Sequence, residues 1–191
     1  HIYDSIEYPS LIRGGHNVMQ VCISNNEVLS PQKHVDLLVA FNQETVEKHV
    51  DELSKGSGIV YDSEGGFDVS NVSSDFVLFG LPISKLSESG KEYLNIICLG
   101  AVVAIFGGNL ETLKTLIEEE FGDKGKAVVS GNTLAAANAY NYVMENYKSR
   151  VSGKLKPAES LGSFIPNMIL TGNEAAALGG QRRLERLCGA L

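Results

Sequence analysis

The order of a strand, a capped helix and a second strand is the pattern that most restricts the fold of this chain. Residues 35–41 are apolar at nearly every position, and Asn42 can then cap a helix with Glu44 in its first turn. The helix is predicted to run to about Leu53, and residues 58–62 to form the next strand. Together these elements make a βαβ unit, whose strands lie parallel in one sheet. A parallel strand is covered on both faces, which explains the unbroken apolar run at residues 37–41.

Further strands precede and follow this unit, and helices dominate after it. The additional strands are predicted at residues 1–3, 18–24 and 76–82, and the helices at residues 93–106, 110–121 and 132–147, with Asn109 as the cap of the second. In the strand at 18–24, Met19, Val21 and Ile23 share one face. Late helices after strands predict an α/β fold, a three-layer α/β/α sandwich with a mostly parallel or mixed central sheet.

Length and charge narrow the class of protein. The chain has 191 residues, enough for one large domain with a substantial core, and a formal net charge of −7. This charge disfavours general binding to nucleic acid or to an anionic membrane. The longest apolar run, residues 94–106, is shorter than the roughly 20 residues that a membrane span needs. We therefore expect a cytoplasmic protein with neither nucleic acid nor a membrane as its partner.

The cysteines and histidines do not form a metal-binding pattern. Cys22, Cys98 and Cys188 share no Cys-x-x-Cys spacing, so they are interpreted as buried thiols rather than as zinc or iron–sulfur ligands. None of the four histidines has a carboxylate or thiol at a metal-ligand interval. His49 is placed on a helix with an apolar stripe, and only His16 is kept as a functional candidate.

The loop Tyr8-Pro-Ser-Leu-Ile-Arg-Gly-Gly-His-Asn17 is the candidate functional segment. Its proline restricts the backbone, whereas its glycines permit angles that other residues resist. Such a turn can direct backbone N–H groups at an anion, with a forked guanidinium and a titratable imidazole beside them. The candidate binding residues are Arg13, Gly14, Gly15, His16 and Asn17. The alternative is a turn leading into a strand, in which Arg13 only pairs with a carboxylate.

These segments resemble the gamma-type domain of 2-oxoacid:ferredoxin oxidoreductases. The resemblance is carried by the loop above, the βαβ unit, Leu94-Asn-Ile-Ile-Cys-Leu-Gly100, Lys124-Gly125 and Asn132. The tail Thr171-Gly-Asn-Glu-Ala-Ala-Ala-Leu-Gly179 resembles the start of the alpha-type domain, to which the gamma-type domain is fused in one branch of the family. The implied organisation is a gamma-type domain at residues 1–150, followed at 151–191 by a linker and a truncated start of an alpha-type domain.

Family members usually begin with a further strand and a glycine-rich turn, which are expected to be missing here. Without them, a sheet edge and an apolar face would be exposed and would invite a partner.

The resemblance implies a module of an enzyme that oxidatively decarboxylates a 2-oxoacid such as pyruvate. Electrons pass to ferredoxin, and the acyl group is left on coenzyme A. In this family the gamma-type domain holds neither thiamine diphosphate nor iron–sulfur clusters, and it lies on the coenzyme A side. The chain alone is therefore expected to bind no cofactor and to be inactive. Thiamine diphosphate, Mg²⁺ and the clusters are expected in its partners: alpha and beta domains or subunits and a ferredoxin-type subunit, with a homodimer also open.

Two alternatives remain at this point. In the first, the chain is a non-catalytic structural domain, and Arg13 and His16 organise a subunit interface. In the second, it is a stand-alone nucleotide-binding α/β protein. That second function needs a glycine-rich phosphate turn between strand and helix, and the junctions at residues 41–44 and 81–84 lack one.

Overall fold

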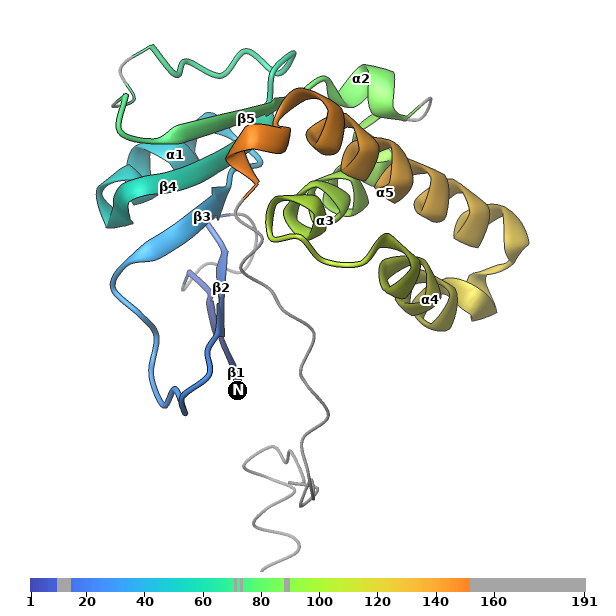
Figure 1. The fold of residues 1–191 in the computed structure, drawn as a ribbon, viewed down its shortest axis with the longest axis horizontal. Coiled ribbons are helices and arrows are strands. Elements are labelled where there is room, and N and C mark those ends of the chain that lie inside the picture. The colour runs from blue at the N-terminus through green and yellow to red at the C-terminus, as the bar shows by residue number, and fades with distance from the viewer. Residues whose placement is uncertain (10–14, 71, 73, 88–89, 152–191) are drawn as a thin grey trace, which may run out of the picture. The chain divides into compact units, whose positions relative to one another are not determined.

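A computed structural model describes residues 1–9, 15–70, 72, 74–87 and 90–151, which belong to one compact unit, His1–Pro157. In chain order its main elements are β1 (Ile2–Glu7), β2 (Val18–Ile23), β3 (Val35–Val39), α1 (Gln43–His49), β4 (Leu53–Asp62), β5 (Val77–Leu81), α2 (Ile83–Leu86), α3 (Leu94–Ile105), α4 (Leu110–Phe121) and α5 (Lys126–Asn146) (Figure 1). Short 3-10 turns are η1 (Val50–Glu52), η2 (Gly90–Tyr93), η3 (Gly122–Lys124) and η4 (Lys148–Arg150).

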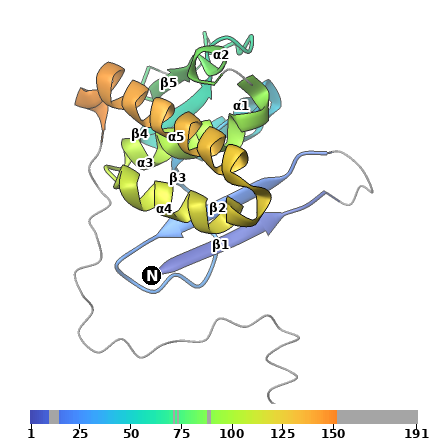
Figure 2. The same ribbon diagram turned by 90° about the vertical axis from the view of Figure 1, so that its right-hand side faces the viewer.

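The central sheet has the strand order β3-β4-β5 and is parallel throughout. Val60 of β4 is fully buried in a core that it shares with α3 and α5. Its neighbour Ile59 points to the opposite face, because side chains alternate along a strand, and it is fully buried as well. On that face lies α1, whose Val46 is buried (Figures 1 and 2). The predicted α/β fold, with a parallel sheet flanked by helices and a βαβ unit, is confirmed.

The first two strands form a separate antiparallel hairpin. Ile2 of β1 lies opposite Ile23 of β2, and Ile6 lies opposite Met19. β2 agrees with the predicted strand, whereas β1 extends to Glu7, beyond the predicted end at residue 3. One face of the hairpin carries five apolar side chains that are between 47% and 75% exposed: Ile2, Ile6, Met19, Val21 and Ile23. We call these residues the hairpin apolar face.

The three predicted late helices form the layer on the other side of the sheet: α3 and α5 share a core with the strands, and α4 packs against these two helices. α3 is apolar almost all round and ends where Gly107 adopts a φ of 70°. α4 begins at Asn109, whose side chain accepts hydrogen bonds from the backbone N–H groups of the first turn, and it buries Leu113 and Ile117. Among the described residues, none of the helices combines the length and hydropathy that a membrane span requires.

Two further predicted element boundaries are wrong. β4 begins at Leu53, although the sequence predicts that the helix reaches about Leu53 and that the strand begins only at residue 58. This first part of the strand is held by Ser57, whose hydroxyl donates to the Val35 carbonyl, and by the Gly56 N–H, which donates to the Asp75 carbonyl. α5 begins at Lys126 rather than near residue 132. None of its first six residues is buried, so this part lacks the buried apolar stripe on which the prediction depended.

Candidate functional site

The described parts of the candidate loop are Tyr8 and Pro9 at its start and residues 15–17 at its carboxyl end, where the chain enters β2. Arg13 and Gly14 lie outside the described residues. Gly15 has a φ of 98°, a backbone conformation that suits glycine and strains other residues. His16 is half-buried, and Asn17 is exposed. The structure therefore separates an inward-facing histidine from an outward-facing amide at neighbouring positions.

His16 contacts a second histidine from a distant part of the chain. Its Nε2 lies 2.8 Å from Nε2 of His49, the ring centroids are 5.0 Å apart, and the ring planes are inclined by 23°. On the far side of the His49 ring, Nδ1 lies 2.9 Å from Oε1 of Glu52. The three side chains form a linear hydrogen-bonded array rather than a cage, and within the described residues no group of three or more His, Cys, Asp or Glu is placed to hold a metal ion.

This array corrects the interpretation of His49. The sequence places His49 on an apolar helix face without a carboxylate partner, yet the structure gives it both Glu52 and His16. The i,i+3 spacing of His49 and Glu52 was a signal that could have been used. The contact with His16 spans 33 residues of sequence and depends on how the hairpin folds against α1. No local pattern encodes it.

Helix α1 positions His49 through the βαβ unit. Its first turn is capped by Asn42, whose Oδ1 accepts from the Thr45 N–H at 2.9 Å. His49 is the last residue of α1. Two charged side chains flank the array, Glu44 and Lys48, with 2.6 Å between Oε1 and Nζ. Hydrogen bonding to Lys48 and its charge lower the pKa of Glu44, with a smaller contribution from His16. His16 therefore lies within electrostatic reach of a carboxylate on α1.

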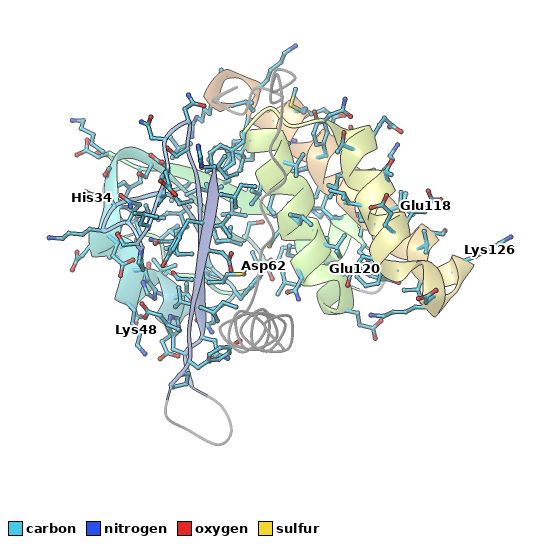
Figure 3. All side chains as sticks on the ribbon, turned by 90° about the horizontal axis from the view of Figure 1, so that it is seen from below. His34, Lys48, Asp62, Glu118, Glu120 and Lys126 are labelled. Carbon is cyan, nitrogen blue, oxygen red and sulfur yellow. The ribbon has the colours of Figure 1, made fainter. Side chains whose placement is uncertain are left out.

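A separate crevice lies at the carboxyl ends of β3 and β4. This is the position where open α/β sheets commonly bind ligands. Its volume is about 240 Å³, and its lining is Ala40, Phe41, Asn42, Gln43, Asp62, Gly65, Gly66, Phe67 and Leu94. Asp62 is set inward among these side chains, whereas Lys48 projects from the surface of α1 (Figure 3). Among the described residues the lining includes an acidic side chain and no basic one, so its chemistry does not favour a phosphate.

The cysteines that the structure describes differ in their surroundings. Burial raises the pKa of the Cys98 thiol to about 12, with a smaller contribution from the charge of Asp62. Cys98 is therefore an unreactive core residue, as predicted. Cys22 is half-buried on β2, and Cys188 lies outside the described residues.

The chain matches the pyruvate ferredoxin/flavodoxin oxidoreductase family over residues 1–142. It is 43% identical over 49 residues to a 2-oxoacid:ferredoxin oxidoreductase subunit alpha from Sulfolobus sp, a match covering 26% of this chain and 8% of that protein.

Two solved structures share the fold. A 2-oxoglutarate:ferredoxin oxidoreductase from Magnetococcus marinus, with 2-oxoglutarate, coenzyme A and succinyl-CoA bound, aligns with a TM-score of 0.71 at 26% identity, over 94% of this chain and 31% of that chain. The gamma subunit of a keto/oxoacid ferredoxin oxidoreductase from Geobacter sulfurreducens aligns with a TM-score of 0.58 at 23% identity, over 75% of this chain and 80% of that subunit.

The chain thus spans only a small part of the Sulfolobus protein and about a third of the Magnetococcus chain. The family match, in contrast, extends over most of the described residues and includes the hairpin, the βαβ unit and most of the helical layer. On that basis the chain belongs to the pyruvate ferredoxin/flavodoxin oxidoreductase family.

Proposed function

We propose that this chain is a gamma-type module of a 2-oxoacid:ferredoxin oxidoreductase, which converts a 2-oxoacid to an acyl-CoA, and that the module lies on the coenzyme A side. The observation that carries the proposal is the family match over residues 1–142. The structural likeness supports it, because it covers 94% of this chain in an oxidoreductase whose structure contains coenzyme A and succinyl-CoA. In this proposal the module is inactive by itself.

The proposed organisation is a gamma-type domain at residues 1–150, followed at 151–191 by a linker and the start of an alpha-type domain. The relatives named as gamma and alpha subunits support this arrangement. Thiamine diphosphate, Mg²⁺ and the iron–sulfur clusters then belong to partner domains: alpha, beta and a ferredoxin-type subunit. A cytoplasmic location is part of the same proposal.

The residues proposed for the coenzyme A contact are Arg13, Gly14, Gly15, His16 and Asn17. Coenzyme A carries phosphates, and a guanidinium beside backbone N–H groups offers them charge-assisted hydrogen bonds. Such a site has to be local, because the chain as a whole carries a net charge of −7. Gly15 with its φ of 98° and the exposed Asn17 amide fit a backbone turned toward a ligand.

The test is the replacement Arg13→Ala in the assembled oxidoreductase. Loss of a hydrogen bond to a charged phosphate should raise the KM for coenzyme A by about 10- to 100-fold, with little change in the KM for the 2-oxoacid. Arg13→Lys should recover part of the affinity, because it keeps the charge but not the fork. Lys124→Ala, on η3, is the matched loss of a cation elsewhere. An unchanged KM for coenzyme A in the Arg13→Ala enzyme would contradict the contact.

A structural role for the module at a subunit interface is the second candidate, and the hairpin apolar face favours it. A contiguous set of exposed apolar side chains commonly marks a protein contact. If Arg13 serves only that contact, Arg13→Ala should weaken assembly, while the complex that still forms keeps its normal KM for coenzyme A. The crevice lined by Asp62 gives no support to a stand-alone nucleotide-binding protein, since it lacks a cation for the phosphates.

A further inference from the structure

The His16–His49–Glu52 array joins two parts of the fold that share no strand pairing in the described part of the chain. His16 precedes β2 in the hairpin. His49 is the last residue of α1 and Glu52 the last residue of η1, and both belong to the βαβ unit. The hydrogen bond of 2.8 Å between the two Nε2 atoms therefore ties the start of β2 to the end of α1. The His49 side chain is only 15% exposed, so this bond is largely screened from water.

The order of donors and acceptors follows from the number of protons available. A neutral imidazole has one N–H, and the hydrogen bond at one nitrogen decides which nitrogen carries it. Glu52 accepts from Nδ1 of His49, so a neutral His49 presents a bare Nε2 and accepts from His16. If His49 is an imidazolium, it donates to Glu52 and to His16 together. Both arrangements place one proton between the two Nε2 atoms.

A second proton between the rings would break the contact. When both imidazoles are protonated, two N–H groups face each other and neither nitrogen can accept. The charged groups near the array are Glu52, which contacts Nδ1 of His49, and the paired Glu44 and Lys48 on α1. Among the described residues of the hairpin, the charged Glu7 lies opposite Val18, which follows His16 by two positions.

We propose that His49, oriented by Glu52, is a positioning residue for His16, and that the shared proton between them holds the start of β2 against α1. The inference extends the proposed function, because this segment carries the outward-facing Asn17 of the proposed coenzyme A contact. Glu52 fixes the ring of His49, His49 fixes the ring of His16, and His16 fixes the backbone beside Gly15.

Two replacements of the same histidine separate the two hydrogen bonds. The amide of His49→Gln can occupy the position of Nε2 and still bond to His16, whereas the amide of His49→Asn can occupy only the position of Nδ1 and faces Glu52. Both variants are uncharged. In the full-length protein within its complex, hydrogen exchange of the amides at residues 16–18 should become about fivefold faster in His49→Asn, the factor expected for the loss of one hydrogen bond. It should stay near the wild-type rate in His49→Gln.

The pH dependence of hydrogen exchange at residues 16–18 tests the shared proton, because simple packing of the two rings would not depend on pH. After correction for the intrinsic exchange rate, protection of residues 16–18 in the wild-type protein should fall once acid has protonated both imidazoles, because two N–H groups then face each other. In His49→Gln the protection should persist in acid, because the amide oxygen accepts from a protonated His16. Exchange in β4 serves as the internal control for the fold. Equal protection of residues 16–18 in His49→Asn and in the wild type would overturn the proposal.

A parallel measurement of the KM for coenzyme A keeps the two proposals distinguishable. If His49→Asn accelerates exchange while Arg13→Ala leaves the KM unchanged, the positioning role stands and the coenzyme A contact fails. If Arg13→Ala raises the KM while His49→Asn leaves exchange unchanged, the coenzyme A contact stands and the positioning role of His49 is wrong.

Discussion

Gly100 shows at the residue level how closely two helices approach in this fold. It lies on α3, where a Cβ atom would collide with the backbone carbonyl oxygen of Ala136 on α5. Small side chains line the contact on the α5 side as well, where Ala135, Ala136 and Ala139 are all buried. The helix pair that covers the sheet therefore depends on the absence of a single methyl group.

We expect Gly100→Ala to destabilise the chain by about 2 kcal/mol or more, because an added methyl group has to push two backbones apart. Urea unfolding of wild-type and variant chains measures this directly. Gly122→Ala is the matched control, since nothing lies within 4 Å of the added atom and the φ of −54° suits alanine. A Gly100→Ala chain as stable as the Gly122→Ala chain would contradict the close approach of α3 and α5.

Glu64 provides a second prediction at the level of one residue, through pH. Hydrogen bonds from the hydroxyl and the backbone N–H of Ser84 lower the pKa of Glu64 below its ordinary value of 4.5. A lowered pKa stabilises the folded chain above the ordinary value, and this stabilisation is lost as the pH falls through the folded-state value. We expect Ser84→Ala to cost stability at pH 7 and progressively less in acid. Urea unfolding at several pH values tests this.

Glu64→Gln is the control for that measurement, because it removes the titrating group. The difference in unfolding free energy between Glu64→Gln and Glu64→Gln with Ser84→Ala should not change with pH in the acid range. A constant offset between Ser84→Ala and the wild type from pH 7 to acid would show that the hydrogen bond does not depend on the charge of Glu64.

The same scale shows what the sequence could predict of the candidate site. Gly15 and His16 could be selected because glycine angles and an imidazole are properties of single residues. His49 could not, since its role depends on a contact across 33 residues. Its position beside Val46 and Val50 is compatible with both an apolar stripe and a contact with the hairpin. Only the folded arrangement of α1 against the hairpin distinguishes the two.

Strand β5 is the element whose edge is most directly protected. It lies at one end of the sheet order, so its outer N–H and C=O groups have no strand partner among the described residues. The Tyr147 hydroxyl compensates at Gly80: it accepts from the Gly80 N–H at 3.1 Å and donates to the Gly80 carbonyl at 3.2 Å. The Tyr147 ring also contacts Phe79 edge-on, with 5.2 Å between centroids. One phenol thus satisfies both backbone groups of an edge residue.

We expect Tyr147→Phe to cost about 1–2 kcal/mol of unfolding free energy, because two half-buried backbone groups lose their partner while the packing of the ring is kept. Chemical denaturation measures the cost. Tyr142→Phe is the matched control, because the Tyr142 hydroxyl makes no hydrogen bond recorded in the described part of the chain. Equal stabilities of the two variants would show that water replaces the Tyr147 hydroxyl at this edge.

Elements were predicted well where their signals are local. Asn42 and Asn109 each cap a helix as predicted, because the side-chain oxygen that bonds to the first-turn N–H groups is part of the sequence pattern itself. The starts of β4 and α5 were missed for the opposite reason. β4 is extended by bonds to distant residues such as Val35, and none of the first six residues of α5 is buried. Tertiary contacts decide such boundaries.

At the scale of the whole molecule, the hairpin apolar face is the surface that we expect a partner to cover when the module assembles into its complex. We expect the combined replacement of Met19, Val21 and Ile23 by threonine to weaken assembly of the oxidoreductase by at least about tenfold. Threonine keeps the preference for β structure but removes most of the apolar contact. Sedimentation of the complex at several concentrations measures the effect.

The control is Leu29→Thr, which removes one apolar side chain that is 80% exposed and lies outside the hairpin apolar face. If the triple variant assembles as tightly as the Leu29→Thr variant, the hairpin apolar face is not a contact in the complex, and the interface role proposed for the module loses its support.

The alternation of side chains in the hairpin limits how related chains can differ in length. Ile2, Ile6, Met19, Val21 and Ile23 share a side only because each strand keeps a strict alternation. Inserting or deleting one residue within either strand would turn every later side chain of that strand to the other face of the hairpin. The apolar side chains beyond that point would then leave the hairpin apolar face. Homologous sequences should therefore vary in length between the two strands and conserve the number of residues within them.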